Sequence, residues 1–440
     1  MSSDHLSPRI LASFLRGELA QPEVTRHLSH VLGCDGCKRL IRSELNRHRS
    51  VPPEGYAKSF LEALSSVVDH EAPLAMERIA APGLAARLHS LTRHQRRLLL
   101  ANDPRYRTWG LCERLIHESR RRTWNLHPDE MLDWARTALL VGEHMDPRQY
   151  GEPHFADLMA DVHTNLANAH RLRSEFGDAR RHLVVARDWL QRGSGDDLER
   201  VRLASYEASL LISLGYFERA VDQLGRQCKR LVRYREHDLQ AKLLVQQGAA
   251  LGYYDPAEAI AVYRRALDLI DARTSPRLAL CARQGLIWCL NASGHSQEAL
   301  IMFQSSQRLF RHFPDRWAQL HLRWTEARLS FDLGKVDEAD SAYQALWTEA
   351  FELDLQLETT LISLDLIEIQ MALDNHQEAA HLAHRLVDMF DAWNVNRRAM
   401  QAWMLLVDAL RQESANREQV TELALFLRRA WKNPEFELRA

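Results

Sequence analysis

The sequence has little glycine and proline for its length, with 18 glycines and 14 prolines among 440 residues. Proteins built from strands and tight turns need many of both, so this scarcity favours an all-α protein. No apolar run approaches the ~18 residues that a membrane-spanning helix requires. The N-terminal segment MSSDHLSPRI also lacks the apolar stretch of a secretory signal. We therefore expect no membrane association.

Cysteines are few, and only Cys34 and Cys37 lie close together among the six. A disulfide-stapled secreted domain is therefore excluded, and a reducing cytoplasmic location is expected. The sequence contains none of the motifs Gly-x-x-x-x-Gly-Lys-[Ser/Thr], Gly-x-Ser-x-Gly, Gly-x-Gly-x-x-Gly or His-Glu-x-x-His. We expect a binding protein and not an enzyme.

The chain divides into four regions by composition. Residues 1–50 are predicted to form a small module of three short helices, and 51–76 a linker with a separate amphipathic helix. Residues 77–150 form a basic helical region, and 151–440 form repeats with a C-terminal cap. The formal net charge is −2 overall, but it is +8 within 78–122 and −9 within 123–440.

A period of 40 residues runs through the last region. Acidic residues recur at 178, 218, 258, 298, 338, 378 and 418, and an alanine follows at or near each of the first six. A turn residue such as Gly215, Gly294 or Gly334 precedes most of these alanines by five positions, and a large apolar residue follows most by four. Each unit is therefore a predicted pair of helices that stacks on its neighbours, because one pair alone cannot bury its apolar face.

The repeated motifs SEFGDA, GYFERA, GHSQEA, GKVDEA and DNHQEA resemble the tetratricopeptide repeat. The resemblance implies a right-handed α-solenoid, here with a period of 40 instead of 34, and a groove lined by the first helix of each unit that binds extended peptides. The alternative for each tryptophan is a place in the core. The groove candidates are Asn168, Arg171, Arg202, Trp288, Asn291, Trp324 and Arg328.

The segment His30-Val-Leu-Gly-Cys34-Asp-Gly-Cys37 carries metal-binding chemistry. Its imidazole and two thiols can turn to one point, which suits tetrahedral Zn²⁺. A closed site needs a fourth ligand. His5 is the leading candidate, and His27 and Asp35 are the alternatives.

The segment HLSPRILASFLRGELAQPEVTRHLSHVLGCDGC resembles the zinc-associated anti-sigma-factor domain of bacteria. The resemblance covers about residues 5–70 and implies that His5, His30, Cys34 and Cys37 are the zinc ligands. It also implies that a sigma factor is the partner. The apolar helix faces would supply the contacts, through Phe14, Leu15, Phe60 and Leu64.

Two further features have competing interpretations. The stretch 78–122 holds eleven arginines interleaved with aromatic residues, a pattern found in nucleic-acid binders. We favour a solvated basic face, or a surface that docks the acidic repeats, because the apolar residues of this stretch look like the buried faces of helices. The two close cysteines could also form a redox pair.

The sequence therefore predicts a cytoplasmic anti-sigma-like transcription regulator whose solenoid holds the partner or a signal. The alternative is a tetratricopeptide scaffold that binds a protein or peptide, with a zinc module that only stabilises the fold.

Overall fold

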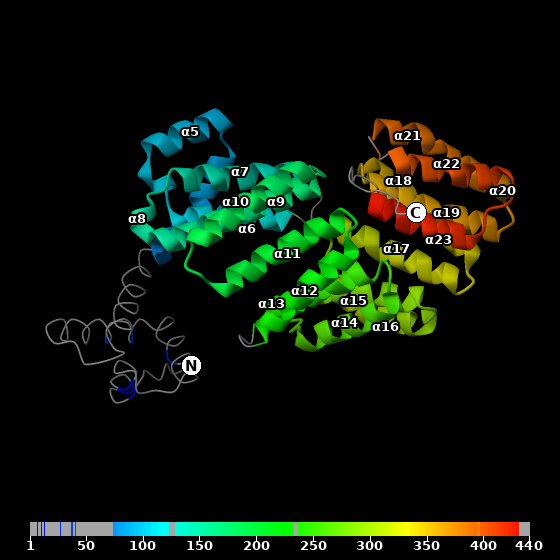
Figure 1. The fold of residues 1–440 in the computed structure, drawn as a ribbon, viewed down its shortest axis with the longest axis horizontal. Coiled ribbons are helices and arrows are strands. Elements are labelled where there is room, and N and C mark those ends of the chain that lie inside the picture. The colour runs from blue at the N-terminus through cyan, green and yellow to red at the C-terminus, as the bar shows by residue number, and fades with distance from the viewer. Residues whose placement is uncertain are drawn as a thin grey trace. The chain divides into compact units, whose positions relative to one another are not determined.

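The computed structural model describes residues 74–122, 128–232, 236–393, 395 and 397–430, together with the single positions 7, 10, 13, 27, 37 and 40 (Figure 1). Every regular element in these parts is a helix. The described residues form two compact units. One contains the described residues up to Leu115 together with Thr137–Glu152, and the other contains the described residues of Ile116–Arg136 together with those from Pro153 onward.

The first unit is built around a helix at residues 74–89. Its further elements are α5 (Arg93–Asn102), η1 (Pro104–Tyr106), α8 (Pro147–Tyr150) and parts of α6 (Trp109–Arg122) and α7 (Pro128–Glu143). Arg96 is buried and donates to the carbonyl oxygen of Leu88 at 2.8 Å and to Oγ1 of Thr137 at 2.7 Å. Arg96 thereby satisfies the carbonyl group of Leu88 at the C-terminal end of the helix at residues 74–89.

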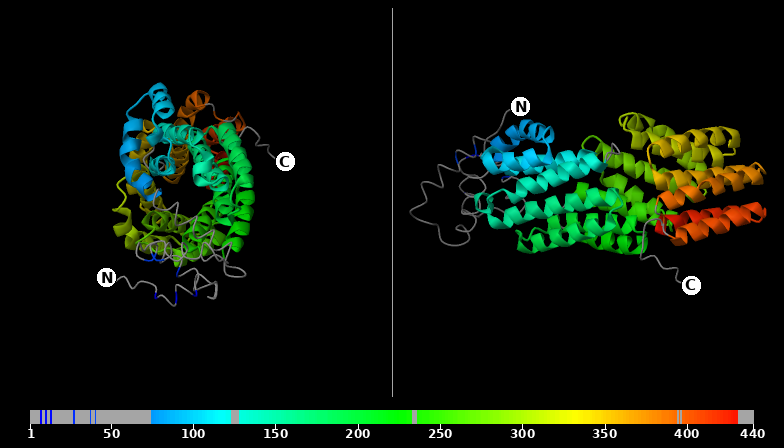
Figure 2. Two further views of the ribbon diagram at one scale, coloured as in Figure 1. Left: turned by 90° about the vertical axis from the view of Figure 1, so that its left-hand side faces the viewer. Right: turned by 90° about the horizontal axis from the view of Figure 1, so that it is seen from above.

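The second unit consists largely of consecutive helix pairs joined by short turns, which lie side by side in Figure 2. The pairs are α9 (Glu152–Leu172) with α10 (Phe176–Arg192), α11 (Asp197–Ser213) with α12 (Phe217–Leu231), α13 (His237–Leu251) with α14 (Pro256–Leu269), α15 (Pro276–Ala292) with α16 (Ser296–Phe310), α17 (Arg316–Asp332) with α18 (Val336–Glu352), and α19 (Gln356–Ala372) with α20 (His376–Arg385). After α21 (Val387–Ala392), α22 (Arg397–Arg411) and α23 (Arg417–Ala430) follow.

The turn inside each pair explains the periodic sequence. Gly215, Gly294 and Gly334 have φ of 76°, 81° and 84°, and Ser174 and Asp374 adopt the same left-handed region. This backbone ends the first helix and reverses the chain. Five residues after each turn residue the recurring alanine is fully buried, at Ala179, Ala220, Ala299, Ala339 and Ala379. Small side chains there allow the two helices to pack closely.

Side-chain hydrogen bonds join successive first helices at separations of about one repeat. Ser205 on α11 donates to Gln246 on α13 at 2.7 Å, and Asn291 on α15 donates to Asp332 on α17 at 2.6 Å. Trp324 on α17 donates from Nε1 to Asp365 on α19 at 2.7 Å. We call the surface formed by α9, α11, α13, α15, α17 and α19 the first-helix surface.

The last hairpin departs from the repeat. α22 packs on α20, as each first helix packs on the preceding second helix, but α23 contacts α19 of the first-helix surface. Arg417 on α23 donates to Asp332 at 2.9 Å and forms an ion pair with Glu368. The predicted C-terminal cap therefore lies partly on the first-helix surface.

None of the helices within the described parts of the chain is long and apolar enough to cross a membrane.

Candidate functional site

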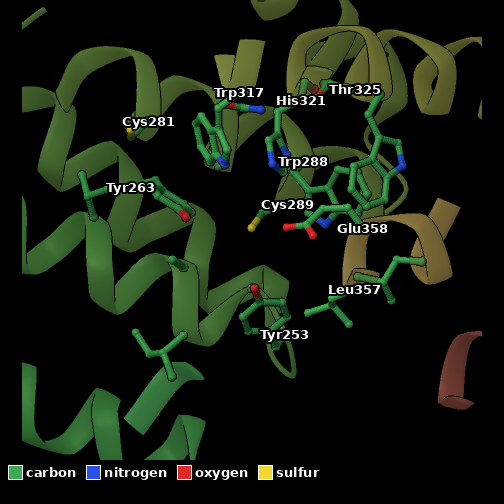
Figure 3. A pocket seen from close by; sticks show the side chains of 18 of the residues that line it. Tyr253, Tyr263, Cys281, Trp288, Cys289, Trp317, His321, Thr325, Leu357 and Glu358 are labelled. Atoms are coloured by element: carbon green, nitrogen blue, oxygen red, sulfur yellow. Dashed lines mark hydrogen bonds between the residues drawn. The ribbon is translucent and has the colours of Figure 1, made fainter. Parts of the chain in front are cut away.

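The first-helix surface encloses a cavity of about 550 Å³. Its walls come from α9 to α19, and they bring together residues 190 positions apart in the sequence, from Arg171 to Leu361. Figure 3 shows Tyr253, Tyr263, Trp288, Trp317, His321 and Glu358 around the open space. The cavity thus combines aromatic faces with a few polar groups, as ligand-binding cavities commonly do.

The aromatic side chains are arranged at defined angles. The rings of Trp288 and Trp324 meet edge to face with centroids 6.0 Å apart. His321 lies between Trp317 and Trp324, at 4.3 Å from the first ring and 5.7 Å from the second. These contacts fix the ring faces that line the cavity, because each ring is held by its neighbour.

Tyr263 shapes another wall, because two glycines leave room for its ring. A Cβ atom on Gly248 would lie 2.9 Å from Cε2 of Tyr263, and one on Gly285 would lie 2.2 Å from its Cζ. The phenol therefore fills the space between α13 and α15. Burial raises the pKa of Tyr263 well above its usual value, so the hydroxyl stays protonated at neutral pH.

Arg171 contributes a cation with neutral partners. Its guanidinium donates to Oδ1 of Asn168 at 2.8 and 3.1 Å and to Oγ of Ser213 at 3.0 Å. Burial lowers its pKa to about 10, which still leaves it charged at neutral pH. No carboxylate among the described residues forms an ion pair with it.

A second cavity of about 500 Å³ adjoins the first, since Gly252, Tyr253 and Trp288 line both. Its polar wall is an ion-pair network around Arg328 on α17. The guanidinium contacts Asp332 at 2.8 Å, Asp365 at 3.1 Å and Glu368 at 2.7 Å. Residues of α23, from Arg417 to Leu425, form the opposite wall.

The predicted groove residues fall into three groups. Arg171, Trp288 and Trp324 line the first cavity, and Trp288, Asn291 and Arg328 line the second. Asn168 is buried and holds Arg171. Arg202 lines neither cavity and forms an ion pair with Glu199 one turn away on α11.

Sequence reasoning missed Tyr253, Tyr263, Cys281 and Glu358, which complete the first cavity. Gly248 and Gly285, each inside a predicted helix, were a usable signal, because such glycines often mark a close approach by another side chain. Among the cysteines of the repeats, Cys228 and Cys289 are buried, whereas Cys281 is half-buried at the cavity wall.

Several arginines of the stretch 78–122 form contacts within the structure. Arg78 forms an ion pair with Glu113 at 2.7 Å, and Arg105 one with Asp103 at 2.7 Å. Arg122 pairs with Glu118 at 2.8 Å and lies 4.5 Å from the ring centroid of Trp134. These arginines join neighbouring helical turns and helices.

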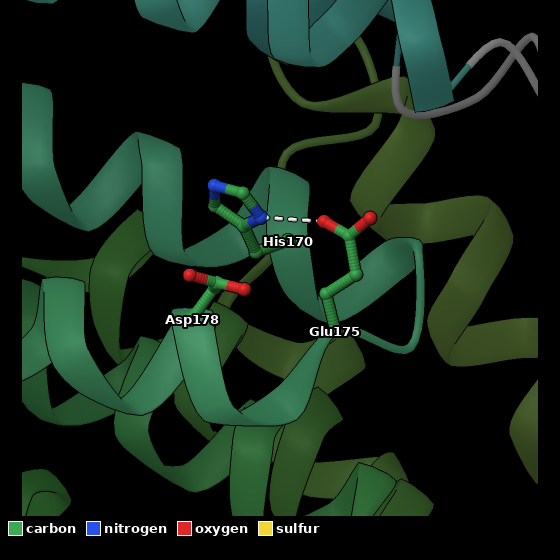
Figure 4. A group of neighbouring side chains, drawn as sticks. All are labelled: His170, Glu175 and Asp178. Carbon is green, nitrogen blue, oxygen red and sulfur yellow. Dashed lines mark hydrogen bonds and ion pairs between the residues drawn. The ribbon is translucent and has the colours of Figure 1, made fainter.

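One group of side chains in the described residues has donors suited to a metal ion. The ligand atoms of His170, Glu175 and Asp178 lie within 4.8 Å of one another at the turn between α9 and α10 (Figure 4). Nδ1 of His170 is 2.6 Å from Glu175, which also accepts from Arg173 at 2.9 Å. Burial raises the pKa of Glu175, but these two hydrogen bonds outweigh it and lower the pKa overall. The group thus already stabilises the turn through its own charges.

The predicted zinc ligands and partner-binding side chains lie almost entirely outside the described residues. His5, His30 and Cys34 are outside, as are Phe14, Leu15, Phe60 and Leu64. Cys37 is described and buried.

Comparison with known proteins gives structural similarity only. No family model matches the sequence, and neither does any curated protein. A solved structure of aspartyl phosphate phosphatase F from Bacillus subtilis matches with a TM-score of 0.50 and 14% identity, over 94% of this chain and 97% of that one. A Rap protein complexed with Competence and Sporulation Factor matches with a TM-score of 0.45 and 14% identity, over 87% of this chain and 99% of that one. The similarity to aspartyl phosphate phosphatase F supports the predicted all-α, tetratricopeptide-like solenoid.

Proposed function

We propose that the chain is a binding protein whose first-helix surface holds an extended segment of a protein or peptide partner. The observation that carries this proposal is the 550 Å³ cavity, which is built mainly by the first helices of successive pairs and lined by aromatic faces. An extended peptide presents side chains and unpaired backbone groups. A long surface with aromatic pockets and polar anchors is suited to both.

The charge of Arg171 favours a ligand that carries an anionic group. Within the described parts of the chain, this half-buried guanidinium donates to the neutral groups of Asn168 and Ser213, and no carboxylate forms an ion pair with it. A carboxylate of the ligand, from an acidic side chain or a C-terminus, would form a charge-assisted pair with it. Asn168 and Ser213 hold the guanidinium in place for this contact.

Affinity capture with matched variants tests the proposal. Full-length protein, Arg171→Gln and Arg202→Gln are used as baits, and captured proteins are identified by mass spectrometry. Arg202 is the control because it lies on a first helix, outside both cavities. We expect a partner that wild type and Arg202→Gln retain and Arg171→Gln loses. A partner retained equally by all three would contradict the proposal.

The N-terminal motif supports a second proposal, that residues 1–50 bind zinc. His5, His30, Cys34 and Cys37 supply imidazole and thiolate donors, the set found in closed zinc sites. Zinc would staple a module too small to bury much core. Metal analysis of the purified, reduced full chain should find about one zinc per chain and none in Cys34→Ala. Wild-type protein without zinc would contradict this.

Inhibition of a sigma factor is the more specific function that the anti-sigma resemblance suggests. Phe14, Leu15, Phe60 and Leu64 would then supply the apolar contacts. A sigma factor captured by wild type and lost with Phe14→Ala or Phe60→Ala supports it, and capture that depends only on Arg171 favours the scaffold function. In either case we propose that the chain acts by binding and not by catalysis.

A further inference from the structure

The helix α23 covers part of the first-helix surface in a way that the repeat does not require. The second helix of an earlier pair packs beside its own first helix and the next one. In contrast, α23 packs beside α22 and also reaches back to α19, next to which it lies in Figure 1. Leu425 on α23 packs against the buried cluster that α11 to α17 form. The helix therefore occupies a surface that the earlier second helices leave open.

The wall that α23 covers is acidic. Asp332, Asp365 and Glu368 all contact Arg328, so this group carries more negative than positive charge before α23 is counted. Arg417 on α23 adds a cation, which donates to Asp332 at 2.9 Å and forms an ion pair with Glu368. The side chain of Arg417 is 61% exposed, whereas those of Asp332 and Glu368 are 14% and 7% exposed. The carboxylates thus belong to the wall, and the cation is added from its open side.

The place of Arg417 within its own helix points to the same role. It is the first residue of α23, where a cation is unfavourable because the N-terminal end of a helix carries partial positive charge. The helix start is stabilised without it. The backbone N–H of Asn416 donates to Oε1 of Gln419, and that of Gln419 donates to Oδ1 of Asn416, both at 2.9 Å. The arginine therefore serves the acidic wall and not the helix.

The fit between α23 and the first helices is incomplete. One side of α23 is buried, through Val420, Leu423 and Leu427. The second cavity, of about 500 Å³, remains beside it, and α23 presents the small side chains of Thr421 and Ala424 to this space. Protein interiors are normally packed with few voids larger than a water molecule. A helix with larger apolar side chains at these two places would fill more of the surface.

We propose that the second cavity is a docking site for a helix of a partner protein, and that α23 is the resident occupant which the partner replaces. The partner helix is amphipathic, with an arginine or lysine in its first turn for the acidic wall. Its apolar side chains follow the spacing of Val420, Leu423 and Leu427, with larger ones in place of Thr421 and Ala424. Release of α23 alone would expose its apolar side to water, so the site opens by exchange. This inference goes beyond the proposed function, which concerns an extended segment at the first cavity.

Synthetic peptides test the exchange on the full-length chain. The native peptide has the sequence of residues 414–430 and carries a fluorophore, so anisotropy measures its binding. We expect wild type to bind it weakly, because the tethered α23 competes at an effective concentration in the millimolar range. Leu423→Asp places a charge on the buried side of the tethered helix and should strengthen binding by about 10-fold or more. Glu422→Gln, at an exposed position of α23, is the control and should bind like wild type.

A second peptide, with Thr421→Leu and Ala424→Leu, tests displacement from wild type. It should bind wild type about 10-fold more tightly than the native peptide, because it buries more apolar surface in the cavity. Hydrogen exchange of the backbone of α23 should then accelerate, since the tethered helix is displaced. A peptide with Glu422→Leu is the control, because its added leucine lies on the exposed side. Binding without faster exchange in α23, or equal binding of the two leucine-containing peptides, would overturn the proposal.

Arg417→Glu supplies a variant that leaves the core of the protein unchanged. Its glutamate meets Asp332 and Glu368 with like charge, so hydrogen exchange in α23 should accelerate and the native peptide should bind more tightly than to wild type. The same substitution within the peptide should abolish its binding to Leu423→Asp. Circular dichroism verifies the helix content of Leu423→Asp, and Arg417→Glu decides the question if that variant unfolds. Unchanged exchange and unchanged peptide affinity in Arg417→Glu would overturn the proposal.

An Arg171→Gln arm separates this inference from the proposed function. Arg171 lines the first cavity and is not part of the second cavity's lining. We therefore expect Arg171→Gln to bind both peptides as wild type does. Loss of peptide binding in this variant would assign the peptides to the first cavity, which overturns the docking of a helix at the second cavity and leaves the proposed function standing.

Discussion

The phenol ring of Tyr263 occupies the place that a side chain on Gly285 would need. A Cβ atom there would come within 2.2 Å of both Cζ and Oη, closer than any real contact. Tyr263 is itself buried on α14 and lines the cavity. The two residues together set one wall of the cavity.

Gly285→Ala should therefore destabilise the second unit by about 1–3 kcal/mol, the usual cost of overpacking a core. Chemical denaturation measures this change. Gly177→Ala is the control, because its Cβ would meet only Arg181 at 3.8 Å, and alanine in a helix is favoured over glycine by up to ~1 kcal/mol. Adding Tyr263→Leu to Gly285→Ala should recover part of the loss. Additive effects of the two substitutions would show that the residues do not compete for space.

Removal of Arg328 should be far more damaging than removal of a surface arginine. Its side chain is 18% exposed, and its partners Asp332, Asp365 and Glu368 are 14%, 17% and 7% exposed. Arg328→Ala leaves Asp365 with the hydrogen bond from Trp324, and leaves the exposed Arg417 as the remaining cation for Asp332 and Glu368. We therefore expect a loss of about 3 kcal/mol, the low end of the cost of breaking a buried ion pair. Arg323→Ala, on the same helix, breaks an exposed pair with Glu349 and an exposed hydrogen bond to the carbonyl oxygen of Gln319, and should cost less than ~1 kcal/mol. Equal effects in urea denaturation would contradict this account.

The repeat could be predicted because each turn and each close helix contact depends on residues that are near one another in the sequence. Each turn needs a residue that tolerates positive φ, such as Gly294, and each close helix contact needs a small residue, such as Ala299. Both therefore recur at fixed spacing, and a period can be counted. Stacking of the pairs follows from the same pattern.

The cavity could be predicted only in part, because its walls depend on side chains brought together by stacking. Trp288 and Arg171 were found through their places on first helices. Glu358 resembles any acid in the first turn of a helix, and nothing in its local sequence shows that it faces Trp288. Within the arginine-rich stretch, the sequence likewise does not distinguish Arg96, which is buried and donates to carbonyl oxygens, from exposed neighbours such as Arg93 and Arg97.

The thiol of Cys281 should react slowly at neutral pH although it lies at the cavity wall. Burial raises its pKa to about 11, against a small opposing effect of Arg277, so under about 1% is thiolate at pH 7.5. Labelling by iodoacetamide, followed by mass spectrometry of the peptide that contains it, should accelerate steeply between pH 7.5 and 9.5. A partner captured through Arg171 should slow the labelling. Rapid labelling at pH 7 that the partner does not slow would contradict the position of Cys281 at the cavity wall.

Two neighbouring imidazoles should make the fold sensitive to mild acid. Nδ1 of His163 on α9 lies 3.0 Å from Nδ1 of His182 on α10, and their rings stack. Burial lowers the pKa of His163 to about 4. Burial also lowers that of His182 to about 4, helped by the positive fields of His163, His170 and Arg181 against that of Asp178.

The lowered pKa values of His163 and His182 determine how the stability of the fold changes with pH. An unfolded histidine takes up a proton near pH 6.5, whereas the folded pair resists protonation until about pH 4. Between these values the unfolded state binds more protons, so stability is fully present above pH 6.5 and falls as the pH drops toward 4. The melting temperature should fall across this window in wild type and in His312→Gln, whose imidazole is exposed. His182→Gln removes one member of the pair and should flatten the decline, because fewer protons are then taken up on unfolding. A decline of equal slope in all three proteins would assign the acid sensitivity to other groups.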